Sequence, residues 1–329
     1  MKKTNFGNRI SVATHATKYF LARKETEVSA FDQLRYSPFL VQLVVTRKCN
    51  LKCGYCNEFD QTSDPVPYDV LLKRLEKIRR LGALAVEFTG GEPLLHPNLV
   101  DLVRRATTYH FPARMLISNA ILMKNDVIRD LNDAGLTHLQ ISVDGVTSNA
   151  TTKKTLNTLR KRLERIAELA RFKVVMSGVV GVCPPGETLA MIDFAKSHGF
   201  IPRVLLIHDH SGQLKLSEEE LRTYEAAKKR IGKRFAEAHG YREQLISGKS
   251  APFKCRAGAR YVYVDEFGDA HWCSQKAPLF TKPILDYSIN DLKTQFYLKK
   301  GGCEAFCTIG CVRTCSEKDE RRRQDYRPD

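Results

Sequence analysis

Ten cysteines are the residues of this sequence that point most clearly to chemistry. They occur at Cys49, Cys53, Cys56, Cys183, Cys255, Cys273, Cys303, Cys307, Cys311 and Cys315. The cytosol keeps thiols reduced, so clustered cysteines in a chain without an export signal usually hold metal rather than form disulfides. Three cysteines lie close together early and six lie late, so the sequence predicts two metal–sulfur sites.

The early cysteines form a C-x3-C-x2-C motif, with Tyr55 directly before the last cysteine. Three thiolates on a short loop can hold three irons of a [4Fe–4S] cluster, whose usual set is four cysteines. The fourth iron would then stay open for a ligand. Basic residues in the same loop should lower the thiol pKa values and offset the negative charge of the cluster. A zinc site on Cys53 and Cys56 is the alternative, and it would need two further ligands.

Alternating strands and helices must position these cysteines. Apolar runs predict strands at residues 39–45, 85–89, 114–118, 137–143, 173–180 and 203–208. Helical spacing predicts helices at residues 69–81, 98–109, 126–133, 152–170 and 188–198. Such alternation indicates an α/β fold with a parallel sheet, in which functional residues gather at the carboxyl ends of the strands. Six units are too few for a closed eight-unit barrel of roughly 250 residues, so we expect a partial (β/α)6 TIM-like barrel. An open doubly wound sheet is the competing topology.

We expect four segments along the chain. They are an N-terminal extension (1–38) with an amphipathic helix at 13–30, a core (39–212), a linker helix (213–250) and a small cysteine-rich domain (251–329). The linker helix should begin with a capping box at Ser217 and run to about His239. Residues 261–273 predict a hairpin, residues 301–315 a loop, and residues 318–329 a frayed, highly charged tail.

The charge of the chain favours anionic partners, because 53 Lys and Arg against 37 Asp and Glu give a formal net charge of +16. Nucleic acid, phosphorylated metabolites, acidic peptides and a membrane surface all meet this description. The sequence shows no RNP signature or zinc-finger spacing, so charge alone does not indicate nucleic-acid binding. Apolar residues make up 43% of the chain, which excludes a disordered or fibrous protein. No apolar run approaches the ~18 residues of a membrane span, and no signal peptide follows Met1, so a cytoplasmic location is predicted.

Polar residues follow the second, third and fourth predicted strands. The second strand ends in Thr89-Gly90-Gly91-Glu92-Pro93, where two glycines would let a ligand lie against the backbone beside an acid. Ser118 and Asn119 end the third strand, and Ser142 and Asp144 end the fourth.

With the three-cysteine motif one strand earlier, this arrangement resembles the radical S-adenosylmethionine (SAM) superfamily. The resemblance covers about residues 39–212 and rests on the cysteine spacing, Tyr55, the Thr89 to Pro93 segment and the order of the strands. It implies that Cys49, Cys53 and Cys56 ligate a [4Fe–4S] cluster whose open iron chelates the amino and carboxylate groups of SAM. The SAM contacts that it implies come from Tyr55, Gly90, Gly91, Glu92, Ser118, Asn119, Ser142 and Asp144, with an adenine pocket near Val179, Val180 and Gly181.

The resemblance also implies the reaction. One electron from the cluster cleaves SAM to methionine and a 5′-deoxyadenosyl radical, which abstracts hydrogen from a peptide or small-molecule substrate. A reducing partner such as flavodoxin or ferredoxin would supply the electron. One alternative is a nucleotide-rearranging cyclase of the molybdenum-cofactor type, which this chain fits less well because its late cysteines lack a C-x2-C. The other is a basic, non-catalytic iron–sulfur or zinc protein that binds nucleic acid.

The late cysteines begin with C-x12-G-x4-C, from Cys255 to Cys273, which resembles the opening of the twitch and SPASM auxiliary iron–sulfur domains. The C-x3-C-x3-C-x3-C that follows departs from the SPASM pattern. Three fully ligated clusters would need eleven cysteines, and the chain has ten. We therefore expect one auxiliary [4Fe–4S] cluster, with zinc as the alternative. Its expected ligands are Cys255, Cys273 and two of Cys303, Cys307 and Cys311, which leaves Cys315 as the weakest candidate and Cys183 as a buried thiol.

The sixth strand ends in His208-Asp209-His210. The two histidines could face the substrate or move a proton. Loop histidines satisfied by ordinary hydrogen bonds are the alternative.

Overall fold

The computed structural model describes Ser29, Asp32 and residues 35–56, 59–207, 214, 216–233, 235, 239–301 and 304–324. Side chains are described up to residue 317, apart from that of Pro278. The helix predicted at 13–30 lies, except for Ser29, outside the described residues. His208, His210 and Cys303 also lie outside them.

The described residues form one nine-stranded sheet with helices packed against it. The strands are β1 (Leu40–Thr46), β2 (Ala85–Gly90), β3 (Ala113–Ser118), β4 (His138–Ser142), β5 (Lys173–Val180), β6 (Ile201–Leu206), β7 (Tyr261–Val264), β8 (Asp269–His271) and β9 (Lys282–Pro283). The α-helices are α3 (Tyr68–Arg80), α4 (Leu99–Thr108), α5 (Asn125–Ala134), α6 (Leu156–Leu169), α7 (Pro185–Ser197), α8 (Glu218–Ile231), α10 (Tyr241–Ile246), α11 (Ile289–Tyr297) and α12 (Gly310–Gln324). Short 3₁₀ helices occur at Pro93–Leu95, Ser274–Leu279, Ile284–Asp286 and Glu304–Phe306.

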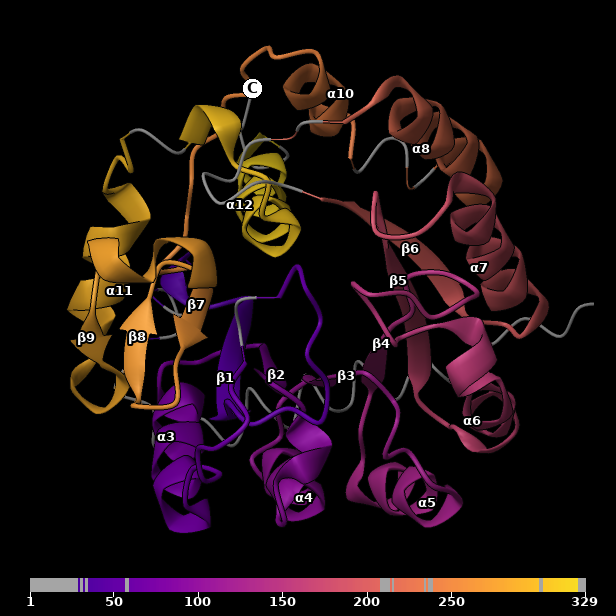
Figure 1. Cartoon of the computed structure of the whole chain (residues 1–329). Helices are drawn as coiled ribbons and strands as arrows, with labels where there is room; N and C mark the ends of the chain where they lie inside the picture. The colour runs from indigo at the N-terminus through magenta and orange to yellow at the C-terminus, as the bar shows by residue number, and fades with distance from the viewer. Residues whose placement is uncertain are drawn as a thin grey trace, which may run out of the picture.

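The strand order distinguishes the two predicted topologies. The sheet runs β6-β5-β4-β3-β2-β1-β7-β8-β9, so the first six strands are neighbours in chain order, and each pair is parallel. A doubly wound sheet would reverse its strand order at a switch point, and this sheet does not. The partial (β/α)6 TIM-like barrel is therefore confirmed, and helices α3 to α8 form an arc around the outside of the sheet (Figure 1).

The hydrophobic core lies between the sheet and this outer arc of helices. Leu43 on β1 and Phe88 on β2 sit opposite each other in the parallel register, and both are fully buried. Leu71, Leu75 and Ile78 come from one face of α3 and are fully buried as well. Full burial of one such side chain contributes roughly 1.5–3 kcal/mol, so this layer holds the strand ends in place.

The opposite, concave face of the sheet carries polar side chains. Gln42 Nε2 on β1 donates a hydrogen bond of 2.6 Å to Glu87 Oε2 on β2. Arg203 Nη1 on β6 donates a hydrogen bond of 3.0 Å to Gln140 Oε1 on β4. Successive residues of a strand point to opposite faces, which explains how Gln42 can be polar between the buried Val41 and Leu43. The barrel interior is thus built for polar contacts rather than for a close-packed core.

The C-terminal part of the chain continues the same sheet. Strand β7 pairs with β1 in parallel, with Val262 opposite Val41, and β8 and β9 follow as antiparallel strands. The predicted hairpin at 261–273 is confirmed as β7 and β8. The prediction of a loop at 301–315 is wrong from Gly310 onward, because helix α12 begins there. The prediction of a frayed tail from residue 318 is wrong up to Gln324, where that helix ends. Figure 1 shows α12 on the concave side of the sheet.

Two predicted helices have different bounds in the structure. Helix α6 begins at Leu156 rather than at residue 152, because the Asn149 side chain accepts the N–H groups of Thr151 and Thr152 and so holds a turn there. The linker helix α8 ends at Ile231 rather than near His239, because Gly232 adopts a φ of 113°. The predicted capping box at Ser217 is present.

Within the described part of the chain, we find no helix with the length and apolar character that crossing a bilayer requires.

Candidate functional site

The three-cysteine loop follows β1 directly and is fixed at both ends. Cys49 N–H donates to the Asp60 carbonyl at 3.0 Å, and Asp60 N–H donates to the Arg47 carbonyl at 2.9 Å. In the middle, Gly54 N–H donates to the Thr151 carbonyl at 2.9 Å, which connects the loop to the segment after β4. The backbone therefore holds all three cysteines at the carboxyl ends of the strands, as the fold predicts.

The three thiols line one cavity, and their chemistry fits the predicted cluster. Cys53 is buried, Cys49 is partly buried and Cys56 is exposed. Ser118, Asn119, Ser142, Lys154 and Gly91 line the same cavity. A cubane cluster spreads its ligands over several irons, whereas a single zinc needs all of them about 2.3 Å from one point. Among the residues described, no three His, Cys, Asp or Glu side chains come together closely enough to hold one metal ion.

The thiol of Cys49 is less acidic than the sequence suggests. Burial raises its pKa, and the negative charges of Glu92, Cys56 and Cys53 act in the same direction. The basic residues in the loop therefore do not lower this pKa in the protein alone. The expected lowering is wrong for Cys49, because desolvation outweighs the hydrogen bond from Leu51 N–H, which favours the thiolate.

Gly90 and Gly91 allow the backbone of the cysteine loop to pack directly against the end of β2. Gly91 N–H donates to the Thr46 carbonyl and Glu92 N–H donates to the Lys48 carbonyl, both at 2.9 Å. A Cβ atom on Gly90 would lie 2.0 Å from the Thr46 carbonyl oxygen, and one on Gly91 would lie 2.3 Å from that of Arg47. The two glycines are thus required by the neighbouring backbone, whatever contact they also make with a ligand.

Glu92 is fully buried and links the ends of β2 and β3. Its Oε1 accepts hydrogen bonds from Ser118 Oγ at 2.8 Å and from Leu94 N–H at 3.1 Å. Its Oε2 accepts a hydrogen bond of 2.7 Å from Asn119 N–H. Burial raises the pKa of Glu92, although these three donors favour the charged form. A carboxylate has about four acceptor positions, so one more donor can bind here.

Asn119 connects this edge of the sheet to the cysteine loop. Its Nδ2 donates to Asn50 Oδ1 at 2.7 Å and lies 3.9 Å from Cys49 Sγ. Its Oδ1 accepts Ile121 N–H at 3.0 Å, which fixes the orientation of the amide. The two residues predicted after the third strand, Ser118 and Asn119, therefore do lie beside Glu92 and Cys49.

Tyr55 and Asp144 form a second polar group at the same edge. Asp144 Oδ2 accepts hydrogen bonds from Tyr55 OH and from Thr152 Oγ1, each 2.7 Å long. Lys154 Nζ lies 3.8 Å from the same oxygen and 4.8 Å from the centre of the Tyr55 ring. Burial, and then Asp144, raise the pKa of Tyr55 far above its ordinary value, so the phenol stays protonated. Asp144 Oδ1 is buried and has no hydrogen-bond partner among the described residues.

The sequence reasoning missed Asn50, Thr152 and Lys154 at this site. The available signal was the polar segment directly after the fourth predicted strand. The helix predicted from residue 152 includes Thr152 and Lys154, so no site role was predicted for their side chains.

Four late cysteines lie in the C-terminal part, and two of them, Cys255 and Cys273, are buried. Burial raises the pKa of Cys273 to about 12, with the nearby thiols of Cys311 and Cys255 acting in the same direction. Burial likewise raises the pKa of Cys307 to about 12, and Cys255 and Cys273 act on it too. Cys315 packs among the apolar side chains of the cluster around Val44 and Val312.

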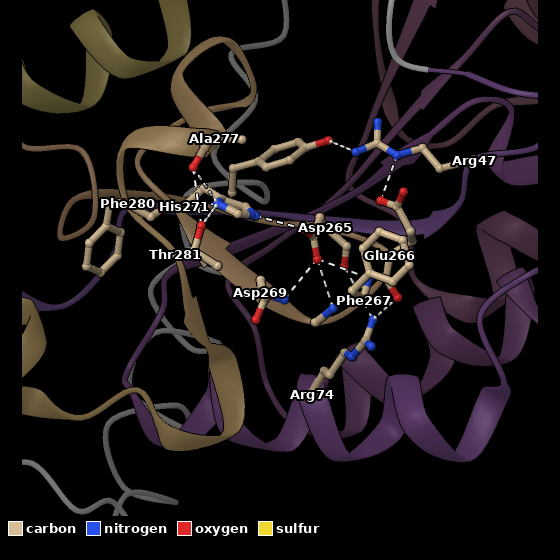
Figure 2. A network of polar contacts seen from close by, with 12 residues as sticks. Arg47, Arg74, Asp265, Glu266, Phe267, Asp269, His271, Ala277, Phe280 and Thr281 are labelled. Carbon is tan, nitrogen blue, oxygen red and sulfur yellow. Dashed lines mark hydrogen bonds and ion pairs between the residues drawn. The ribbon is translucent and has the colours of Figure 1, made fainter.

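A network of charged groups connects the cysteine loop to the C-terminal hairpin (Figure 2). Arg47 Nε donates to Glu266 Oε2 at 2.7 Å, and its Nη2 donates to Tyr263 OH at 2.9 Å. Arg74 Nη1, from α3, donates to the carbonyls of Asp265 and Glu266 at 3.3 and 3.0 Å. Both parts of the chain therefore share one polar interface beside Arg47.

Asp265 organises the turn of that hairpin. Its Oδ1 accepts the N–H groups of Phe267, Gly268 and Asp269 at 2.8–3.0 Å. Its Oδ2 lies 2.8 Å from His271 Nε2, while His271 Nδ1 faces two backbone carbonyls, those of Ala277 and Phe280 (Figure 2). Burial lowers the pKa of His271, but the hydrogen bond to Asp265 outweighs it and the pKa is raised overall.

A larger cavity of about 280 Å³ lies between the two cysteine regions. Tyr55, Arg203, Tyr241 and Cys311 line it together with aliphatic side chains, among them the predicted adenine-pocket residue Val179. The cavity therefore touches both the three-cysteine loop and helix α12.

Comparison with known proteins agrees with the fold. Residues 43–197 match the family model described as "Radical SAM superfamily". A partial barrel with three cysteines after β1 and the glycine pair after β2 defines a cofactor-dependent class of enzyme. Residues 43–197 of this chain are a radical SAM domain, and the similarity to enzymes of that class indicates that the chain is an enzyme.

Three similar proteins illustrate the relationship. The chain is 36% identical over 132 residues to a PqqA peptide cyclase of Bradyrhizobium diazoefficiens, covering 39% of this chain and 34% of that protein. It is 29% identical over 206 residues to a GTP 3′,8-cyclase of Helicobacter pylori, covering 58% and 64%. Its fold resembles the crystal structure of Streptococcus suis SuiB bound to precursor peptide SuiA, with a TM-score of 0.62, 15% identity and coverage of 90% and 72%. The chain thus spans about a third of the peptide cyclase that it matches.

Replacing Gly90 with alanine should destabilise the protein, because the new Cβ would overlap the Thr46 carbonyl at a φ of 145°. We expect a loss of about 3 kcal/mol or more in the free energy of unfolding, measured by denaturant titration. Gly186→Ala is the matched control, since nothing lies within 4 Å of its Cβ position, and it should change stability by less than about 1 kcal/mol. Equal stability of the two variants would contradict the seating role of Gly90.

Replacing Asp265 with asparagine should weaken the hairpin, because an amide cannot accept hydrogen bonds from both the turn and a protonated His271. We expect the free energy of unfolding to fall by about 1–3 kcal/mol, measured by thermal or denaturant unfolding. Asp286→Asn, at an exposed position, should have little effect. A loss at Asp286 as large as that at Asp265 would show that the network does not fix the hairpin.

Proposed function

We propose that this protein cleaves SAM reductively and uses the resulting radical to modify a peptide. The observation that supports this most directly is the single cavity lined by Cys49, Cys53 and Cys56 together with Ser118 and Asn119. The peptide substrate is supported by the similarity to PqqA peptide cyclase, although the chain spans only about a third of that protein. The GTP 3′,8-cyclase match comes at lower identity, so we place the peptide first.

The residues of the chain divide between holding the cluster and holding SAM. Cys49, Cys53 and Cys56 would bind a [4Fe–4S] cluster, which supplies the electron for SAM cleavage when it is bound. The remaining acceptor position of Glu92 suits the ammonium group of SAM. The bare Oδ1 of Asp144 suits a hydroxyl or ammonium donor, since a buried acceptor without a partner is costly.

Lys154 and Tyr55 would complete this site. Lys154 lies at the cavity edge and brings a cation toward the position where a SAM carboxylate would bind. Tyr55 stays protonated and hydrogen-bonded to Asp144, so it orients that carboxylate. Gly90, Gly91 and Ser142 border the site and keep their predicted roles as SAM contacts.

We further propose that Cys255, Cys273, Cys307 and Cys311 bind one auxiliary [4Fe–4S] cluster. Cys255 and Cys273 share one buried cluster with Cys311 packed against it, which supports the assignment, and Cys311 also borders the large cavity. A cluster there would either transfer electrons or anchor the substrate. Cys303 stays an alternative fourth ligand.

The proposed activity needs an electron donor and reduced cysteines. A flavodoxin or ferredoxin would supply the electron, and a reducing compartment such as the cytosol would keep the cysteines reduced and available for iron.

His208 and His210 remain predicted substrate contacts. We keep the proposed segments at residues 1–38, 39–212, 213–250 and 251–329.

Cys53→Ala should abolish 5′-deoxyadenosine formation, because it removes one of three proposed ligands of the SAM-cleaving cluster. The assay uses anaerobically reconstituted full-length protein with SAM and dithionite, and mass spectrometry measures the product. Cys183→Ala is the matched control, because Cys183 is a buried thiol that accepts a hydrogen bond from Asn149 and lies outside both cysteine groups. Absence of product from wild-type protein with a full iron complement would contradict the proposed activity.

Cys307→Ala should lower the iron content of the reconstituted protein from about eight to about four atoms per chain, because the auxiliary cluster would lose a ligand. Iron is measured by colorimetric assay and the clusters by Mössbauer spectroscopy. Cys315→Ala should keep about eight irons. Wild-type protein with only about four irons would show that the auxiliary cluster is absent.

A further inference from the structure

The large cavity contains buried polar groups whose hydrogen bonds are incomplete. Arg203 Nε and Tyr241 OH are both buried and have no hydrogen-bond partner among the described residues. Both side chains line the cavity. A buried donor without an acceptor costs free energy, and a charged one costs more, so the pair indicates a ligand that supplies acceptor oxygens.

The charge around the cavity gives the sign of that ligand. Arg203 and Arg242 both line it and repel each other, since burial and then Arg242 lower the pKa of Arg203. Arg242 already donates to the Val204 carbonyl at 2.8 Å, and Arg313 packs on the Tyr241 ring at 4.2 Å. The nearby carboxyl group, Glu87, is hydrogen-bonded to Gln42, and its pKa is raised by burial. The described lining of the cavity therefore contains two arginines and no Asp or Glu.

The residues that line the cavity indicate which anionic group of a ligand would fit there. Much of the wall is aliphatic, with Val179, Leu205, Ile207 and Leu245 among the residues that line it. One guanidinium Nε and one phenol suit a single carboxylate with an apolar stem. A triphosphate, with several charges to neutralise, would need more donors than the described wall offers.

We propose that this cavity binds a carboxylate of the substrate peptide, with Arg203 and Tyr241 as the specificity-determining residues. The carboxylate belongs to an acidic side chain or to the peptide C-terminus. The inference rests on the proposed function, because it places this group between Tyr55, beside the SAM site, and Cys311, on helix α12. It also gives a role to the +16 net charge, which would draw an acidic peptide toward the protein.

The test measures binding without turnover, by ligand-observed NMR on the anaerobically reconstituted full chain with SAM and no reductant. The probes are N-acetyl-Ala-Glu-Ala-amide, its glutamine counterpart, N-acetyl-Ala-Ala-Ala with a free carboxylate, and inorganic phosphate. We expect one of the two carboxylate peptides to bind about 10- to 100-fold more tightly than the glutamine peptide, and the better of them identifies the source. Equal binding of the glutamine peptide, or tighter binding of phosphate, would overturn the proposal.

Two variants assign the effect to the cavity. Arg203→Gln should remove the preference for a carboxylate, while Arg165→Gln, at an exposed surface ion pair, should keep it. Tyr241→Phe removes only a hydroxyl that has no described partner, so it should leave the melting temperature unchanged or raised yet weaken carboxylate binding several-fold. Unchanged binding in a folded Tyr241→Phe together with a folded Arg203→Gln would contradict the assignment.

This experiment and the SAM-cleavage assay fail independently. Loss of 5′-deoxyadenosine formation with an intact carboxylate preference would overturn the proposed function alone. SAM cleavage by a protein that does not distinguish glutamate from glutamine would overturn this inference alone.

Discussion

The close approach of two backbone segments determines the geometry of the candidate site. The chain at Gly90 and Gly91 passes so near to Thr46 and Arg47 that no side-chain carbon fits between them. This contact fixes the start of the cysteine loop against the end of β2. Glu92, the next residue, then joins β2 to β3 through Ser118 and Asn119. The cysteines and the polar strand ends are therefore held by one continuous set of backbone and side-chain contacts.

The structure separates two environments on the two faces of one sheet. Aliphatic side chains such as Leu43 and Phe88 fill the face beneath the helices and supply the apolar stabilisation. The concave face holds Gln42, Glu87, Gln140 and Arg203, whose burial without full pairing would be unfavourable in an ordinary core. Arg203 also lines the cavity proposed to bind the substrate, where a polar ligand would complete its pairing. The fold thus obtains its stability from one face and its chemistry from the other.

The sequence predicts the core well because the relevant signals are local. Strand and helix periodicity, the capping box at Ser217 and the cysteine spacing each depend on residues near one another in the chain. The orphan oxygen of Asp144, the donor pair in the large cavity and the contact of Arg47 with Glu266 depend on packing between distant segments. No local sequence pattern predicts these long-range contacts. Helix α12 was missed for another reason: its charged residues and cysteines show no clear apolar period, and its buried Val312 and Cys315 are too few to reveal one.

The parallel pairing of β1 with β7 has a consequence for how the chain is made. Strand β1 has two edges, and β2 covers one of them soon after it is synthesised. The other edge stays uncovered until β7 is synthesised and Val262 can pair opposite Val41, long after the first six strands have left the ribosome. Contacts between distant residues form slowly, and an uncovered strand edge is prone to intermolecular pairing. Strand β1, an interior strand of the finished sheet, would therefore be the aggregation-sensitive element of the nascent chain until β7 pairs with it.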